Sequence, residues 1–432
     1  MQIFDTSFHA IVQGGRRAGA NMAILDVSHP DIEEFITMKS DSSKMTNFNL
    51  SVAVSKEFMR AVIEEKNFDL INPRNKKIKK TVQARELFDL LAAQAWKTGD
   101  PGLIFIDEMN ETYPFKDAGV FCTGACGQYA LEHFEGVPYA HINLSKMISE
   151  REEKISLDKE KLSSTVHTVV HFLDNCIDAH RYVHPDIEAK TKASRKIGLG
   201  VMGFADLLFS LQIPYGSKEC IDLIDEIMTC IKTESRTASN SLAKKRGVFP
   251  RFKESKWSEP MRNATLTSLA PTGTTSLLAS ASQSIEPVYA LSFTNKTSDG
   301  QEFTILNKAF KEAVDGLSMD RTAKIQLQFV DSVQNISWLP KDFKDTFKTA
   351  MDISPEDHLT VMATFQKYVD NAISKTINLP NKATVDEVKD IMLAAYKKRC
   401  KGITIYRDGC RSDQVLGTKT QTRLYAFEDE EK

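Results

Sequence analysis

The chain has 432 residues, of which 41% are hydrophobic and 26% charged, and its formal net charge is -2. These values are typical of a globular protein, and they exclude a disordered chain, a collagen-like repeat and a small disulfide scaffold. The near-neutral charge disfavours direct nucleic-acid binding through a basic surface. No run of ~18 apolar residues predicts a membrane span. Seven cysteines, an odd number, indicate reduced thiols and a cytoplasmic location.

Short apolar runs alternate with longer segments of helical periodicity, which predicts an α/β fold. The expected strands are 21–27, 47–54, 102–106, 141–144, 265–269 and 402–406. The expected helices are 81–96, 157–184, 217–246, 358–374 and 380–398. The basic stretch 72–80 is expected to be a solvated loop. Because no Ser-, Gly- or Pro-rich linker divides the chain, we expect one large domain.

Segment 13–21 combines three glycines with two arginines just before an expected strand. Glycine lets the backbone approach a ligand closely, and arginine pairs with phosphate in a forked geometry. The segment, which includes Gln13, Arg16 and Arg17, therefore indicates either an anion-binding loop or a basic surface turn.

Segment 269–276 places small hydroxyl residues directly after an expected strand. Backbone amides at a helix start, together with several hydroxyls, can hold a phosphate group. The segment is not a Walker loop, because no Gly-Lys-Ser/Thr follows. A Ser/Thr-rich turn that only caps a helix is the alternative interpretation.

Cys122 and Cys126 lie four residues apart in a glycine-containing loop, 122–128. The pair could be two buried structural thiols, a redox pair, half of a metal site or the carrier of a radical. Zinc would need two further ligands, of which His133 and His141 are nearest, and their spacing matches no strong zinc pattern.

Four histidines form two i,i+4 pairs within the expected helix 157–184. They are His167 with His171, and His180 with His184. Such pairs can bind a metal in a hydrolase, but no HExxH pattern accompanies them. Core or surface histidines are the alternative, and we expect no metal site.

Taken together, these segments resemble the large catalytic subunit of ribonucleotide reductase, most closely the adenosylcobalamin-dependent class II enzymes. The similarity runs from Ile3 to Leu416 in ordered matches. These include QGGRRAGANMAILDVSHPDIEEFI (13–36), NFNLSVAVS (47–55), DPGLIFIDEMN (100–110), HINLSKM (141–147), RKIGLGVMGFADLL (195–208), APTGTTS (270–276), IEPVYA (285–290), SKTINLP (374–380) and KGITIYRDGCRSDQVL (401–416).

The resemblance implies a ten-stranded α/β barrel of the ribonucleotide reductase and glycyl radical enzyme type, made of two antiparallel halves of parallel strands. A finger loop, expected here near 120–145, would lie inside the barrel. The barrel domain would span 1–416, with its N-terminal strands missing from this chain. Residues 417–432 would form a flexible tail. The resemblance also implies adenosylcobalamin as the radical source, because 404–407 contains one tyrosine rather than an adjacent pair.

Carried over by position, Cys126 is the cysteine that would become a thiyl radical and remove the 3'-hydrogen of a ribonucleotide. It lies sixteen residues before Ile142, the family's usual spacing. The phosphate-binding turn falls on Pro271, Thr272, Gly273, Thr274 and Thr275. The loop that conveys the identity of a nucleotide effector falls on 13–21, with Gln13, Arg16 and Arg17 as the candidates.

The chain departs from the family around Cys126. The family motif Asn-Pro-Cys-Gly-Glu is here Gly124-Ala125-Cys126-Gly127-Gln128. The substrate-binding asparagine is thus Gly124, and the catalytic glutamate is Gln128. An amide cannot serve as a general base near neutral pH, and losing a positioned base typically costs ~10²–10⁴ in rate. The family's redox cysteine eleven residues after the radical cysteine is Val137.

Relatives carry roughly two hundred residues before the segment that matches Ile3, about the size of one domain. A barrel without them would expose strand edges. We therefore expect a separate N-terminal reductase fragment, self-association or a rearranged barrel, and an external thiol as reductant. The sequence leaves two functions open: reduction of ribonucleotides, or a catalytically impaired homologue that acts as a nucleotide-binding, regulatory or structural protein.

Overall fold

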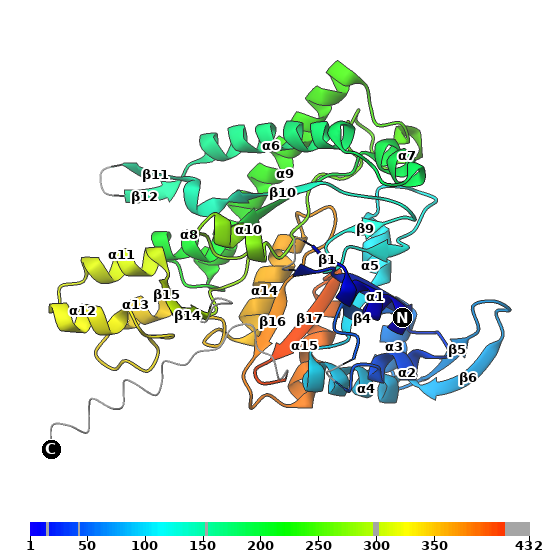
Figure 1. Cartoon of the computed structure of the whole chain (residues 1–432), viewed down its shortest axis with the longest axis horizontal. Coiled ribbons are helices and arrows are strands. Elements are labelled where there is room, and N and C mark those ends of the chain that lie inside the picture. Colours follow the sequence, from blue (N-terminus) through cyan, green and yellow to red (C-terminus); the bar gives the residue numbers. More distant parts are fainter. Residues whose placement is uncertain (14–16, 42–43, 152–153, 297–301, 411–432) are drawn as a thin grey trace.

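The central strands form one continuous layer, here called the wall, in the computed structural model (Figure 1). The structure describes residues 1–13, 17–41, 44–151, 154–296 and 302–410. The largest sheet has the order β16-β17-β7-β4-β3. Its strands are β3 (Asn21–Asp26), β4 (Phe48–Val54), β7 (Gly102–Phe105), β16 (Thr376–Leu379) and β17 (Gly402–Arg407). Strands β3, β4 and β7 are parallel, as are β16 and β17, and the two groups meet antiparallel where β7 pairs with β17.

The wall continues beyond β16 through single parallel bridges. Leu269 bridges to Ile373, and Thr267 bridges to Leu199 in β13 (Gly198–Met202), which pairs in parallel with β10 (Tyr139–Asn143). The order is therefore β3-β4-β7-β17-β16, then 265–269, β13 and β10. These are two groups of parallel strands that run in opposite directions. Among the described residues, β3 and β10 each pair with a strand on one side, so they are the two ends of the wall.

Along each strand, side chains point alternately to the outer hydrophobic core and to the interior of the barrel. In β4, Leu50, Val52 and Val54 belong to the main hydrophobic core. Asn49 and Ser51 point the other way, where Ser51 lies near Gly102 of the neighbouring strand. Small and polar side chains therefore face the interior and leave room for a loop.

The finger loop fills this room. It contains the short hairpin of β8 (Cys122–Thr123) and β9 (Ala130–Leu131). Beside it, a small apolar cluster joins strands on different parts of the wall. The cluster consists of Ile24, Ile104, Met109, Val120 and Ala372.

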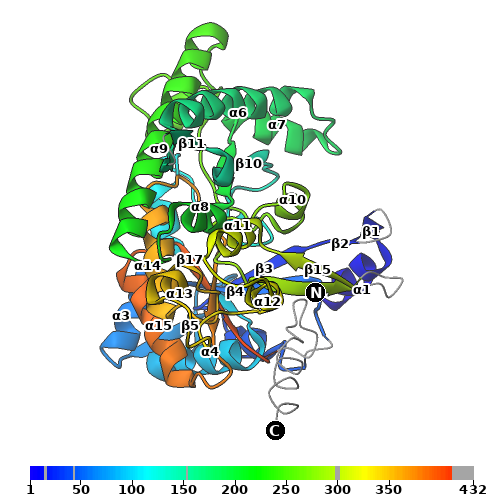
Figure 2. The same ribbon diagram turned by 90° about the vertical axis from the view of Figure 1, so that its left-hand side faces the viewer.

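Helices cover the outside of the wall (Figures 1 and 2). On one side lie α2 (Ile32–Thr37), α3 (Lys56–Ile63), α4 (Ala84–Thr98) and α15 (Val385–Lys397), and on another lie α6 (Lys159–Ala179) and α9 (Lys218–Arg246). Their ends follow local rules. Helix α4 stops at Gly99 in the left-handed conformation (φ 76°), and α15 begins with a reciprocal capping box of Thr384 and Glu387.

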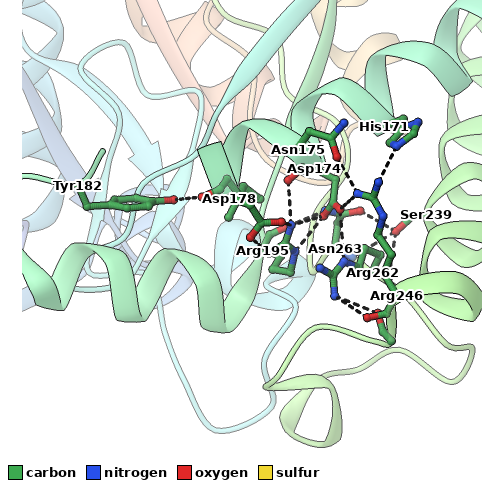
Figure 3. Close-up of polar contacts among 12 residues, drawn as sticks. His171, Asp174, Asn175, Asp178, Tyr182, Arg195, Ser239, Arg246, Arg262 and Asn263 are labelled. Atoms are coloured by element: carbon green, nitrogen blue, oxygen red, sulfur yellow. Dashed lines mark hydrogen bonds and ion pairs between the residues drawn. The ribbon is translucent and has the colours of Figure 1, made fainter. Parts of the chain in front are cut away.

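A buried charged network fastens α6 to its surroundings (Figure 3). The carboxylate of Asp174, which has no exposed surface, accepts hydrogen bonds from Arg195 Nε at 2.9 Å and Asn263 Nδ2 at 3.1 Å. Arg246 and Arg262 contact its other oxygen at 3.3 Å. A buried carboxylate is stable only when charges and hydrogen bonds compensate its lost hydration, and this network supplies both.

The remaining elements complete the chain. The strands are β1 (Val12–Gln13), β2 (Arg17–Ala18), β5 (Asn67–Ile71), β6 (Ile78–Gln83), β11 (Ile148–Arg151), β12 (Lys154–Leu157), β14 (Ser292–Lys296) and β15 (Glu302–Leu306). The helices are α1 (Gln2–Ala10), α5 (Ile106–Thr112), α7 (Pro185–Ser194), α8 (Phe204–Leu211), α10 (Gly273–Leu278), α11 (Lys308–Gly316), α12 (Arg321–Leu327), α13 (Lys341–Thr346) and α14 (Pro355–Gln366), with 3-10 turns at Leu144–Lys146 and Phe252–Glu254.

Three expected elements differ from the structure. The expected helix 358–374 ends at Gln366, because residues 371–374 instead run beside 267–269 in the wall. The expected helix 157–184 is α6 alone, and a second helix, α7, starts at Pro185. The expected loop 72–80 contains the start of β6, which forms a hairpin with β5. The expected tail, 417–432, lies outside the described residues.

No helix in the described part of the chain is both long enough and apolar enough to cross a membrane.

Candidate active site

Strand direction brings the candidate segments to one end of the barrel. The turn at 271–275 follows the C-terminal end of 265–269, and segment 13–21 precedes the N-terminal end of β3. Because the two groups of strands are antiparallel, these two ends lie on the same side of the wall. Ligands of α/β proteins commonly bind where parallel strands end.

Cys126 lies at the tip of the finger loop. Asn49 of β4 donates a hydrogen bond from Nδ2 to the carbonyl oxygen of Ala125 at 2.7 Å. The carbonyl oxygen of Gln128 accepts from Ser268 Oγ at 2.9 Å and from the Ala372 N–H at 3.1 Å. The tip is therefore tied to strands on two different parts of the wall. The thiol of Cys126 is half-buried.

Gln128, expected at the position of the general base, turns back toward Cys126. Its Oε1 accepts the backbone N–H of Cys126 at 3.2 Å, and the residue is 6% exposed. A neutral carboxamide in this position fixes the turn but offers no site for a substrate proton near neutral pH.

The base of the finger loop is held by a buried lysine. Lys196 Nζ donates to Glu135 Oε2 at 2.7 Å, to Tyr113 Oη at 2.6 Å and to the carbonyl oxygen of Ala130 at 3.1 Å. Burial lowers the pKa of Lys196 and raises the pKa of Tyr113. No sequence pattern reveals this cluster, because its members are far apart along the chain.

The expected phosphate turn divides into inward and outward residues. Thr272 is buried in the left-handed conformation (φ 57°). Its Oγ1 accepts the Ser284 N–H at 2.8 Å and lies 2.7 Å from Ser276 Oγ. Pro271 is partly buried, whereas Gly273, Thr274 and Thr275 are exposed. The hydroxyl of Thr272 thus shapes the turn, and the exposed residues are the ones that a phosphate could reach.

His141 supports the start of this turn. Its Nε2 accepts the backbone N–H of Ala270 at 3.2 Å, so the ring is neutral with its proton on Nδ1. Burial lowers its pKa to about 4. The ring lies over Gly200, where an added Cβ would be 2.6 Å from His141 Cδ2. The sequence indicates a strand at 141–144 but gives no sign that the His141 ring supports this turn.

Segment 13–21 is described only in part. Gln13 and Arg17 pair as backbone partners in the antiparallel hairpin of β1 and β2. Arg16 lies outside the described residues. The role of these three residues in effector binding stays a prediction.

The paired histidines make contacts of other kinds. His167 Nε2 lies 2.7 Å from Glu234 Oε2, and His171 Nε2 lies 2.9 Å from Arg246 (Figure 3). His184 Nδ1 accepts the N–H of Asp186 and caps α7. Across the residues that the structure describes, no group of three or more His, Cys, Asp or Glu side chains could hold a metal ion.

A sequence profile of the ribonucleotide reductase barrel domain matches residues 1–261 and 258–406, which is nearly the whole chain. The chain belongs to the ribonucleotide reductase family. This confirms the resemblance found in the sequence, and with it the α/β barrel fold of the reductase type.

Similar proteins agree with this assignment. The chain is 42% identical over 426 residues to a vitamin B12-dependent ribonucleoside-diphosphate reductase of Thermoplasma acidophilum, covering 97% of this chain and 55% of the relative. It is 41% identical to a protein of the same name from Mycobacterium tuberculosis, covering 100% of this chain and 62% of the relative. The chain thus spans less than two thirds of these relatives.

A solved structure shares the fold. The class Id ribonucleotide reductase alpha subunit of Actinobacillus ureae superposes with a TM-score of 0.76 at 22% sequence identity, covering 94% of this chain and 73% of that one. At this identity the likeness supports the fold alone.

Proposed function

We propose that the chain is the barrel segment of a ribonucleotide reductase that forms deoxyribonucleotides through a thiyl radical on Cys126. One observation carries the proposal: the finger loop places Cys126 inside the barrel, where Asn49, Ser268 and Ala372 hold the tip. The exposed part of the 271–275 turn would bind the substrate phosphate at the same end. Cys126 would remove the 3'-hydrogen of the ribose and become a thiol again.

The electrons for the reduction would come from a separate reductant. Val137 stands where the family has a redox cysteine, so we propose an external dithiol as the reductant. In the balanced reaction, one ribonucleotide and two thiols give one deoxyribonucleotide, one disulfide and one water. Two electrons pass from the thiols to the 2'-carbon, whose hydroxyl leaves as the water.

The names of the two relatives, vitamin B12-dependent reductases, support adenosylcobalamin as the cofactor. The residues present fit a bulky external radical source in two respects. The thiol of Cys126 is only half-buried, and Tyr139 on the end strand β10 is 55% exposed. When bound, the cofactor supplies the radical that oxidises the thiol. This chain itself would contribute to the reaction the half-buried thiol of Cys126 and the uncharged hydrogen-bonding groups that hold the tip of the finger loop.

We propose that a partner covers the ends of the wall, either a separate N-terminal reductase segment or a second copy of the chain. Unpaired strand edges and exposed apolar side chains favour association. Helix α1 buries none of its side chains, and Ile3, Phe4 and Ile11 are exposed beside the β3 end. A nucleotide effector would bind with the help of segment 13–21, and a cytoplasmic location would keep the thiols reduced.

One observation favours the second function. Gly124, Gln128 and Val137 together replace the substrate-binding, proton-accepting and redox residues of the family. A chain with these changes could bind nucleotides as a regulatory or structural homologue without turnover.

The test measures deoxyribonucleotide formation from ribonucleoside di- and triphosphates with adenosylcobalamin and dithiothreitol. The chain is assayed alone and with the N-terminal segment of the Thermoplasma relative. We expect product from the wild-type chain, none from Cys126→Ser, and unchanged product from Cys176→Ser, a half-buried thiol on α6. Nucleotide binding without product in every mixture would favour the regulatory or structural function instead.

A further inference from the structure

The turn that carries Cys126 is tightly closed. The Gly127 N–H donates to the carbonyl oxygen of Gly124 at 2.9 Å, and the Gly124 N–H donates to that of Tyr129 at 3.3 Å. Gly127 has a positive φ of 79°, a conformation that glycine adopts without strain. The hairpin therefore brings residues 124, 128 and 129 close together beside the backbone of Cys126.

Gly124 has no room for a side chain. A Cβ at this position would lie 2.8 Å from Tyr129 Cδ2, 3.1 Å from Gln128 Nε2 and 3.2 Å from Gln128 Cδ. Tyr129 cannot yield easily, because it is 5% exposed and its ring packs over Gly198, where a Cβ would be 3.0 Å from Tyr129 Cε1. A side chain at 124 must therefore shift the Tyr129 ring, its nearest neighbour, and must also push the carboxamide of Gln128 out of its observed position by a few tenths of an ångström.

Gln128 is held through its side-chain carboxamide and through its backbone carbonyl oxygen. Its Oε1 accepts the Cys126 N–H, its Nε2 lies over Gly124, and its own carbonyl oxygen accepts bonds from Ser268 and Ala372. The same carboxamide thus does two things: it occupies the space above Gly124 and it restrains the backbone of Cys126.

We propose that Gln128 is a positioning residue for the Cys126 thiol, and that Gly124 and Gln128 form a coupled pair in which a side chain at 124 excludes the observed position of Gln128. The coupling is a property of this chain's geometry, while its importance for turnover rests on the proposed function of Cys126. The residue is neutral, so it orients the thiol without adding a charge beside it.

A glutamate at 128 would keep the acceptor for the Cys126 N–H but would place a negative charge next to the thiol. A nearby negative charge disfavours the thiolate and raises the pKa of a cysteine. Gln128→Glu therefore separates the effect of the hydrogen bond to Cys126 from the effect of the neutral charge, because the variant retains the bond and changes the charge.

The test is the rate of alkylation of Cys126 by iodoacetamide as a function of pH, measured by peptide mass spectrometry with Cys122 as an internal reference. Thermal unfolding of each variant checks that it folds. We expect Gly124→Ala and Gln128→Ala each to speed alkylation by about tenfold, within the range of interactions between residues in contact. Gly316→Ala, where an added Cβ meets no atom within 4 Å, should leave the rate unchanged.

The double variant tests the coupling. In the Gln128→Ala background, Gly124→Ala should have a smaller effect than in the wild type, because the carboxamide is already gone and only the contact with the Tyr129 ring remains. Gln128→Glu should keep the thiol protected and shift the pH midpoint of alkylation upward by about one unit. If the destabilised double variant fails to fold, the pH profile of Cys126 alkylation in Gln128→Glu still tests the positioning role of Gln128.

Additive effects of Gly124→Ala and Gln128→Ala, or a Gln128→Glu profile identical to that of the wild type, would overturn the proposal. Alkylation needs no turnover. A chain without reductase activity can therefore still show the coupling, and an active reductase without the coupling would contradict this inference alone.

Discussion

The two ends of the finger loop are held by different kinds of interaction. At the base, Lys196 and Glu135 form an ion pair of 2.7 Å with almost no exposed surface. At the tip, Asn49, Ser268 and the backbone of Ala372 hold the loop through neutral hydrogen bonds. The base thus relies on charge and the tip on uncharged groups.

The base and the tip of the finger loop therefore have different roles. A buried ion pair gives a rigid anchor, because separating its partners leaves an uncompensated charge. The same charges next to Cys126 would alter the titration of its thiol. Neutral partners at the tip fix the backbone without placing a charge next to the thiol.

The largest expected effect is at the base. Lys196→Met leaves the carboxylate of Glu135 buried without its cation and should lower the free energy of unfolding by about 3–5 kcal/mol. The additional change Glu135→Leu should restore most of this loss. The measurement is denaturant unfolding, and Lys218→Met, which removes an exposed ion pair with Asp222, serves as the control with little effect. A loss below about 1 kcal/mol in Lys196→Met would show that the base is not an ionic anchor.

The next effect concerns His141, the neutral ring beside the phosphate turn. Its pKa of about 4 lies below the ordinary value of 6.5. Between these values the unfolded chain binds a proton that the folded chain does not, so stability falls as the pH is lowered from 6.5 to 4. At ~1.4 kcal/mol per unit, the His141 contribution to this loss of stability is at most about 3.5 kcal/mol.

Replacing the ring isolates this contribution from that of other histidines. His141→Gln keeps an acceptor for the Ala270 N–H but cannot be protonated. Its free energy of unfolding should therefore fall less steeply than that of the wild type between pH 6.5 and 4. Parallel curves for the two proteins would mean that His141 does not titrate as the structure indicates.

The smallest effect is at the tip. Asn49→Ala removes the hydrogen bond to Ala125 and should cost about 1 kcal/mol. Hydrogen exchange should then quicken at the amides of 124–128 and remain unchanged at those of β9. Asn240→Ala, which removes a similar bond to the carbonyl oxygen of Pro260 on the outside of α9, should leave the exchange at 124–128 as it was. Uniform quickening along the finger loop would contradict separate anchoring of tip and base.

The sequence predicted the strongly patterned elements well. The apolar run at 47–54 is β4, and the helix expected at 217–246 is α9. Strand β13 was not predicted, because its glycines lower strand propensity. The structure shows why glycines stand there: an added Cβ at Gly200 would collide with the Ser268 carbonyl oxygen and the His141 ring, and one at Gly198 would crowd the Tyr129 ring.

The sequence likewise indicates only some of the residues of the candidate site. The resemblance assigns Cys126 by its spacing from Ile142 and the 271–275 turn by an ordered motif, and the roles of both stay predictions. Lys196, Asn49 and the supporting role of His141 could not be predicted, because each depends on a contact between segments far apart along the chain. Gln128 was expected to replace the family's catalytic glutamate without acting as a base, and its bond to the Cys126 N–H becomes visible only in the folded turn.

The most direct test of the central claim, that Cys126 removes the 3'-hydrogen of a ribonucleotide, uses a substrate deuterated at the 3'-carbon. The chain, completed with the N-terminal segment of the Thermoplasma relative, is supplied with adenosylcobalamin and dithiothreitol, and the rate of deoxyribonucleotide formation is compared with that of the unlabelled substrate. We predict slower product formation from the deuterated substrate and no product from Cys126→Ser. Equal rates for both substrates, or product from Cys126→Ser, would contradict the account.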